Sequence, residues 1–117
     1  MSKAELFLRC LRHYADRNIE AISAMFADDI TLRDWNVFVA GKAAVTAETA
    51  LNFAASETIV IKTLHLYENA DAVIGELKFT LNGNTDLFVV DAMAFNDEGR
   101  IRSIRAYLGR GDAAPSN

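Results

Sequence analysis

The sequence has 117 residues, of which 51% are hydrophobic, so it holds enough apolar material for the core of one small domain. Its formal net charge of −4 disfavours a nucleic-acid partner, because such proteins gather Lys and Arg on one face to neutralise phosphates. The single cysteine, Cys10, excludes an internal disulfide, and no segment approaches bilayer-spanning length, so we expect a cytoplasmic protein that does not enter a membrane.

The first part of the chain is predicted to hold two helices. Ser2 followed by Glu5 matches a capping box at the start of the first helix. Apolar residues then recur at helical spacing: Leu6, Phe7, Cys10, Leu11 and Tyr14. Asn18 is the expected N-cap of a second, short helix, whose apolar residues extend to Phe26 and which is expected to end near residues 28–29.

A strand and a third helix are expected next. Residues 30–35 alternate between apolar and polar side chains, which places Ile30, Leu32 and Asp34 on one face of a half-buried strand. Gly41 then interrupts the pattern. The alanine-rich residues 42–55 favour a helix, because alanine loses little side-chain entropy there.

From residue 57 onward the sequence predicts strands, at 58–67, 72–81, 86–95 and 101–108, because β-branched and aromatic residues dominate. Asn82 and Gly83 suit a tight hairpin, and consecutive strands are expected to be antiparallel neighbours. Helices followed by hairpin-linked strands indicate an α+β domain, with a pocket beneath the helices if the sheet curves. We expect residues 1–110 to form this domain and residues 111–117 to form a disordered tail.

Asp91 is the most informative polar residue, because it interrupts the apolar run LFVVDAMAF. On strand alternation it shares a face with four apolar residues: Leu87, Val89, Met93 and Phe95. Burial there should raise its pKa and leave a neutral carboxyl that can donate a hydrogen bond. The alternative is that Asp91 faces outward or pairs with a residue of the next strand, such as Arg105.

Asp34 ends its predicted strand next to Trp35 and Phe38, so it could lie at the mouth of the pocket and abstract a proton from a ligand. An equally compatible interpretation is that it forms a turn at the end of the strand. His13 and His65 have no partner at metal-ligand spacing, so we assign no metal.

Several segments, in this order, resemble the ketosteroid isomerase branch of the NTF2-like (SnoaL-like) superfamily: FADDITLRDW with the helix before it, GKAAV, VVDAMAFN and GRIRSIRAYLG. The resemblance extends from Phe7 to Gly109. It implies a cone-shaped α+β fold in which three N-terminal helices pack on a curved antiparallel sheet that encloses a pocket. It also implies a homodimer and activity without a cofactor.

The resemblance implies roles for particular residues. Asp34 aligns with the catalytic base of the family, and Asp91 aligns with the aspartic acid that donates to the oxyanion, a carboxyl that the family is well known for holding neutral in an apolar site. The family's tyrosine donor of the first helix is replaced here by Cys10, the proline after the base is replaced by Trp35, and the loop at 36–40 is shorter. Tyr14 lies one turn after Cys10 on the same helical face, so we hypothesise that its hydroxyl supplies the missing donor.

Two hypotheses for function follow. The first is an isomerase or cyclase that abstracts a proton next to the carbonyl of a small apolar cyclic molecule, with Asp34, Asp91 and Tyr14 as catalytic residues. The second is a non-catalytic module that binds a small apolar ligand or associates with a second copy. In either case six residues are expected to line the pocket: Phe7, Cys10, Phe26, Trp35, Phe38 and Met93.

Overall fold

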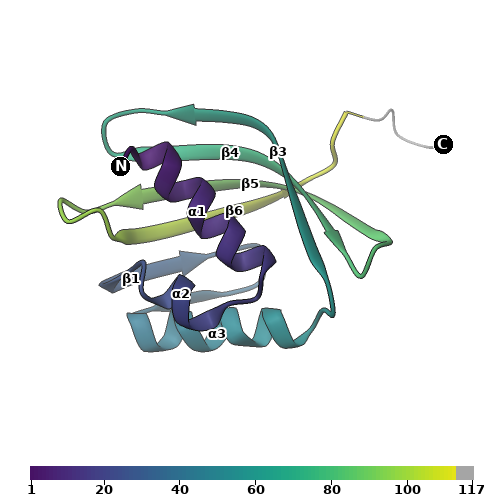
Figure 1. Ribbon diagram of the computed structural model, residues 1–117, viewed down its shortest axis with the longest axis horizontal. Helices are drawn as coiled ribbons and strands as arrows, with labels where there is room; N and C mark the ends of the chain where they lie inside the picture. Colours follow the sequence, from purple (N-terminus) through teal and green to yellow (C-terminus); the bar gives the residue numbers. More distant parts are fainter. Residues whose placement is uncertain (113–117) are drawn as a thin grey trace.

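Three helices pack against one curved, six-stranded sheet in the computed structural model, which describes residues 1–112 (Figure 1). The helices are α1 (Lys3–Ala15), α2 (Ile19–Ser23) and α3 (Lys42–Ala54). The strands are β1 (Phe26–Arg33), β2 (Phe38–Ala40), β3 (Ile59–Glu68), β4 (Ala72–Leu81), β5 (Thr85–Phe95) and β6 (Ile101–Gly109). They are arranged in the order β2-β1-β6-β5-β4-β3. Residues 113–117, which belong to the predicted tail, lie outside the described residues.

The predicted α+β class is confirmed, and so is the antiparallel pairing of successive strands from β3 to β6. One pairing was not predicted: β1 lies beside β6 in parallel, with Leu32 opposite Ile104. Because β1 and β6 are far apart in the sequence, only the tertiary structure brings these two strands together. None of the helices in residues 1–112 is long and apolar enough to cross a membrane.

The structure corrects the prediction for residues 24–29. The second helix ends at Ser23, and Phe26 begins β1 instead of completing the helix. Phe26 is opposite Ile101 of β6, and the Ile101 amide donates to the Met25 carbonyl at 2.8 Å. Strand pairing therefore overrides the local helical pattern. The edge strand β2 is also new, and it pairs with the end of β1.

A local capping box begins α1, and a long-range contact joins its end to α3. The predicted capping box of α1 is present, since the Ser2 hydroxyl accepts from the Glu5 amide at 3.1 Å and the Glu5 carboxylate accepts in return from the Ser2 amide. At its other end Arg17 has a φ of 53° and reaches across to α3. Its guanidinium donates to the carbonyl oxygens of Phe53 and Ser56, at 3.3 and 2.6 Å. This links the C-terminal ends of α1 and α3.

Gly75 determines how closely α1 approaches the sheet. It lies on β4 directly opposite Asp91, and its missing side chain leaves the space that the fully buried ring of Phe7 occupies. A Cβ atom at this position would lie 2.6 Å from the tip of the Phe7 ring, which is a steric overlap. Helix α1 therefore packs against β4 at Gly75, where no side chain stands in the way of Phe7.

Gly75→Ala should lower the free energy of unfolding by roughly 1 to 3 kcal/mol, because the buried Phe7 ring has no room to move away. Urea denaturation measures this change. Gly109→Ala is the matched control, since a Cβ there meets its nearest atom only at 3.7 Å. Adding Phe7→Leu to Gly75→Ala should restore part of the loss. Equal stability of the two alanine variants would contradict the seating of α1 on Gly75.

Candidate functional site

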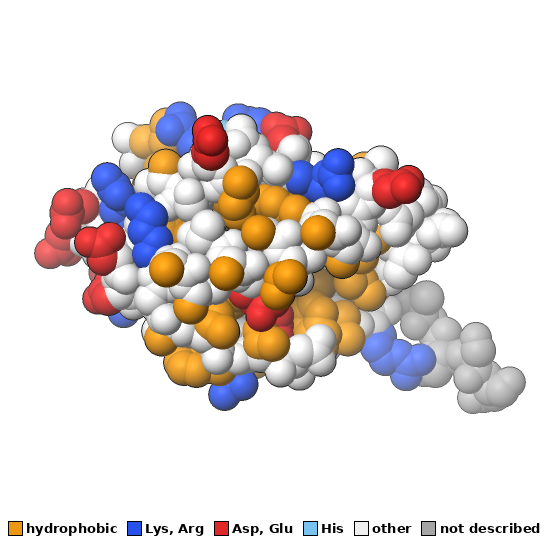
Figure 2. Space-filling view, turned by 90° about the horizontal axis from the view of Figure 1, so that it is seen from below, with side chains coloured by type: hydrophobic (Ala, Val, Ile, Leu, Met, Phe, Trp, Pro, Cys, Tyr) orange, Lys and Arg blue, Asp and Glu red, His pale blue; other side chains and the backbone are white. Residues whose placement is uncertain are grey.

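A cavity of about 250 Å³ lies between α1, α3 and the inner face of the sheet. Seen from the side of α3, the surface is hollowed beside this helix, and hydrophobic side chains line the hollow (Figure 2). The lining combines many apolar residues with a few polar ones. The polar side chains come from all parts of the fold: Tyr14, Asp34, Asn36, Thr49, Asn52, Ser56 and Asp91. Such a mixture is typical of sites for small molecules.

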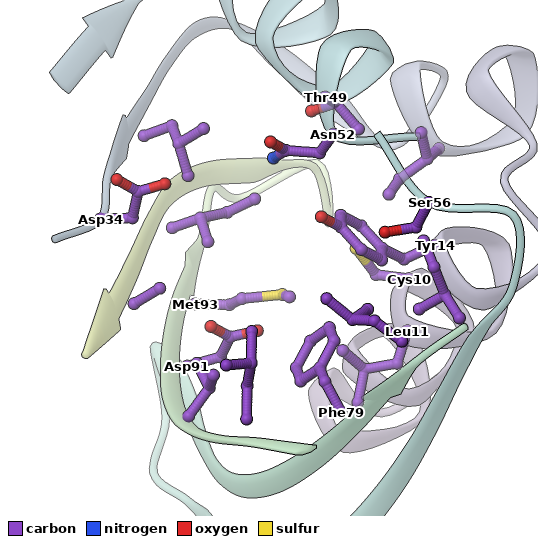
Figure 3. A pocket seen from close by; sticks show the side chains of 18 of the residues that line it. Cys10, Leu11, Tyr14, Asp34, Thr49, Asn52, Ser56, Phe79, Asp91 and Met93 are labelled. Atoms are coloured by element: carbon purple, nitrogen blue, oxygen red, sulfur yellow. The ribbon is translucent and has the colours of Figure 1, made fainter. Parts of the chain in front are cut away.

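Asp91 lies on the cavity wall that β5 provides, and only 8% of it is exposed (Figure 3). Burial raises the pKa of its carboxyl to about 7. The proposed pairing with Arg105 is wrong, because Arg105 is opposite Ala92 and points away from the inner face, whereas Asp91 is opposite Ala106. Within residues 1–112 the carboxyl has no hydrogen-bond partner. It is a buried acid that faces the cavity.

Asp34 forms the turn after β1 and also lines the cavity. Its Oδ1 atom accepts from the backbone amides of Asn36 and Val37, at 2.7 and 2.8 Å, so it does form the turn after β1. The same side chain also lines the cavity. Because the turn uses Oδ1, the Oδ2 atom is the one left to act on a ligand.

Tyr14 is fixed in the cavity wall by two aromatic rings. The Phe53 and Phe79 rings meet it edge to face, with centroids 4.9 and 5.9 Å away. Burial raises the pKa of the Tyr14 phenol to about 12, the nearby Asn52 amide acts against this rise, and the charge of Asp91 adds to it. The hydroxyl therefore keeps its proton and can donate it in a hydrogen bond.

Four of the six apolar residues expected around the pocket do line it: Cys10, Phe26, Trp35 and Met93. Burial raises the pKa of the Cys10 thiol to about 12, so this side chain behaves as a small hydrophobic group. The structure does not bring Phe7 and Phe38 to the cavity. The Phe7 ring packs against Gly75 in the core instead. Phe38 is 52% exposed on edge strand β2, with the Arg33 guanidinium 5.0 Å from its ring centroid.

Sequence reasoning missed the polar residues that α3 and the turn after it contribute. Thr49, Asn52 and Ser56 line the cavity, and the alanine content of this stretch does not indicate them. Thr49 and Asn52, three residues apart, share one face of α3, and Ser56 follows two residues after the helix ends; the spacing of the first two is the signal that could have revealed them.

The sequence and the fold both match known proteins. Residues 7–104 match the family described as SnoaL-like domain. Among curated proteins, none matches the sequence. An epoxide hydrolase/cyclase-like enzyme, SalBIII, which is described in connection with pyran ring formation in the polyether salinomycin, is 22% identical with a TM-score of 0.80, over 94% of this chain and 92% of that one.

Two further solved structures share the fold. An NTF2-like protein of unknown function from Cytophaga hutchinsonii is 13% identical with a TM-score of 0.79, covering 93% of this chain and 91% of that one. A ketosteroid isomerase-like protein from Kribbella flavida is 15% identical with a TM-score of 0.71, covering 91% and 76%. At these identities the likeness establishes the fold alone.

Asp91→Asn should remove a pH dependence of stability. The ordinary pKa of this carboxyl is 3.8 and the folded value is about 7, so the folded state keeps a proton that the unfolded chain has lost. The contribution of Asp91 to the free energy of unfolding is therefore largest below about pH 4, and it is lost as the pH rises through about 7. The free energy of unfolding of the parent, measured against that of Asp91→Asn by urea denaturation, should fall by roughly 3 kcal/mol from about pH 4.5 to about pH 8.

Asp97→Asn is the control for this experiment, because Asp97 is exposed in the turn between β5 and β6. It should leave the slope with pH almost unchanged. A parent and an Asp91→Asn variant with parallel pH profiles would show that Asp91 is not a buried acid.

Proposed function

The chain belongs to the SnoaL-like family, and from this premise we propose that it is an isomerase or cyclase that abstracts a proton next to the carbonyl of a small apolar cyclic molecule. The observation that carries the proposal is the unpaired, buried carboxyl of Asp91 in the same cavity as Asp34 and Tyr14. Perturbed acids in clefts are candidates for catalysis.

The proposed reaction begins at Asp34. Its Oδ2 takes the proton from the carbon next to the ligand carbonyl, and the electron pair of that C–H bond moves to form an enolate. Returning the same proton to another carbon completes an isomerisation. The residues of the cavity suffice for these steps, so the proposal requires no cofactor.

Asp91 is proposed to stabilise the enolate. Below about pH 7 its carboxyl is protonated, so it donates a hydrogen bond to the oxygen on which negative charge develops. Tyr14 is the proposed second donor, because its phenol is neutral and its ring is held by Phe53 and Phe79. Both donors act in an apolar cavity, where hydrogen bonds to a developing charge are stronger than in water.

One observation favours the alternative of a pocket that binds a ligand without catalysis. Two backbone amides already donate to Asp34 Oδ1, so the turn after β1 uses one of the two oxygens of the proposed base. The family's donor is also replaced by the apolar Cys10. The two functions differ in whether the proton next to the ligand carbonyl is removed.

We further propose that the protein forms a homodimer through the outer face of the sheet. Three exposed apolar side chains lie there, Tyr67 on β3, Ile74 on β4 and Tyr107 on β6. Tyr67 is opposite Ile74, and Tyr107 is opposite the half-buried Val90 of β5, which lies between β4 and β6. Exposed apolar patches of this kind mark association surfaces, and a twofold pairing would cover both copies of the patch at once.

Asp34→Asn should slow proton exchange by about 100-fold or more, because the amide cannot accept the proton. The assay follows deuterium uptake at C2 of 1-tetralone in D₂O by NMR, with the uncatalysed rate subtracted. Asparagine keeps an oxygen for the two backbone amides of the turn, so the far-UV circular dichroism spectrum should match that of the parent. Equal exchange by variant and parent would refute the catalytic role and favour the alternative function.

Ile74→Glu should convert a dimer into a monomer, because it places a charge in the apolar patch. Sedimentation equilibrium measures the mass. Leu51→Glu is the matched control, since Leu51 is exposed on α3 and should leave the dimer intact. A monomeric parent, or a dimer that Ile74→Glu leaves unchanged, would rule out this interface.

A further inference from the structure

The cavity carries polar groups on two facing walls, and the proposed reaction uses only part of them. Asp91 projects from the sheet on one side, whereas Thr49 and Asn52 project from α3 on the other (Figure 3). Ser56 follows α3 and is labelled beside Tyr14 in the same view. We call Asn52 and Ser56 the helix-wall pair. Neither has a role in the proton transfer described above.

The helix-wall pair is free to bind a ligand because Arg17 performs the task that such residues often have. Asn and Ser near the end of a helix commonly satisfy backbone groups. Here the Arg17 guanidinium binds the carbonyl oxygens of Phe53 and Ser56 instead. The third polar residue of this face, Thr49, is already satisfied, since its hydroxyl donates to the Val45 carbonyl at 2.8 Å.

The hydrogen-bonding capacity of the pair is largely unused. Ser56 is only 9% exposed, and its hydroxyl has no hydrogen-bond partner within residues 1–112. The Asn52 side chain is exposed, and its amide lies near the Tyr14 hydroxyl. A few polar side chains on the wall of an apolar cavity fix the orientation of its occupant, so Asn52 and Ser56 indicate a polar group on that occupant.

The space between the two walls is apolar and limited in size. Met93 lies between them in Figure 3, and Phe79 and Leu11 also line the cavity. The cavity volume is about 250 Å³. A dry cavity of about 150 Å³ holds one benzene ring. The cavity therefore suits an apolar body of about two fused rings.

We infer that the ligand of this cavity is a compact, mono- or bicyclic ketone with a second oxygen at its far end, whose carbonyl meets Asp91 and whose second oxygen meets Asn52 and Ser56. This inference rests on the proposed function for the carbonyl end alone. A hydroxyl suits the helix-wall pair, because Asn52 both donates and accepts and Ser56 does the same.

The test compares two probes that differ only in the second oxygen, 1-tetralone and 6-hydroxy-1-tetralone. Binding is followed by NMR through the indole N–H signal of Trp35, which is the single tryptophan and lines the cavity. The hydroxylated probe should bind the parent roughly three- to tenfold more tightly, as expected for one or two neutral hydrogen bonds. In Asn52→Leu this preference should fall to about one- to twofold.

Thr49→Val is the matched control, because it lies on the same wall but its hydroxyl is already bonded to the Val45 carbonyl. It should keep the preference of the parent. Equal binding of the two probes by the parent, no binding of either, or a preference that Asn52→Leu retains would each overturn the inference.

The outcome is independent of catalysis. Asp34→Asn should retain the preference for 6-hydroxy-1-tetralone whether or not the parent exchanges the C2 protons of 1-tetralone. A preference without exchange would overturn the proposed function and leave the two-oxygen ligand standing. Proton exchange without a preference for 6-hydroxy-1-tetralone would support the proposed function and overturn the two-oxygen ligand.

Discussion

The close approach of Phe7 to Gly75 is the contact on which the cavity depends. It seats α1 against β4, and the residues that follow on the same helical face, Cys10 and Tyr14, are thereby carried over the inner face of the sheet. Gly75 is also opposite Asp91, so the glycine that admits the helix and the acid that faces the cavity are cross-strand neighbours. A bulkier residue at this position would displace the wall of the site together with the helix.

The site is built at a cost in stability that the rest of the domain must offset. The Asp91 carboxyl is buried in the cavity wall, and the rise of its pKa to about 7 reflects the cost of burying its charge. The Arg17 bridge between α1 and α3 works in the opposite direction, because it satisfies carbonyl groups at the end of a helix without using the polar side chains beside them. The Asn52 and Ser56 side chains are thus not used to satisfy these carbonyl groups.

How far the site could be predicted depends on the kind of pattern that each residue belongs to. Asp91 was found from strand alternation alone, because a single carboxyl on a strand face that is otherwise apolar breaks a strong and regular pattern. The turn and the cavity position expected of Asp34 are compatible, because a carboxylate has two oxygens and the turn uses one, whereas its role as a base stays a prediction. Phe7 and Phe38 were misplaced, because an aromatic residue suits a core, a cavity and an edge strand equally well in the sequence.

Apart from the short strand β2, the sequence by itself determined the order of helices and strands, the hairpins, the caps of the first two helices and the face on which Asp91 lies. These follow from periodicities and turn residues within a few positions of one another. Only the tertiary structure decided the parallel pairing of β1 with β6, the early end of α2 and the meeting of Asp91 with Asn52 and Ser56 around one cavity. Those features join segments that are distant in the chain, and the packing of the helices on the curved sheet brings them together.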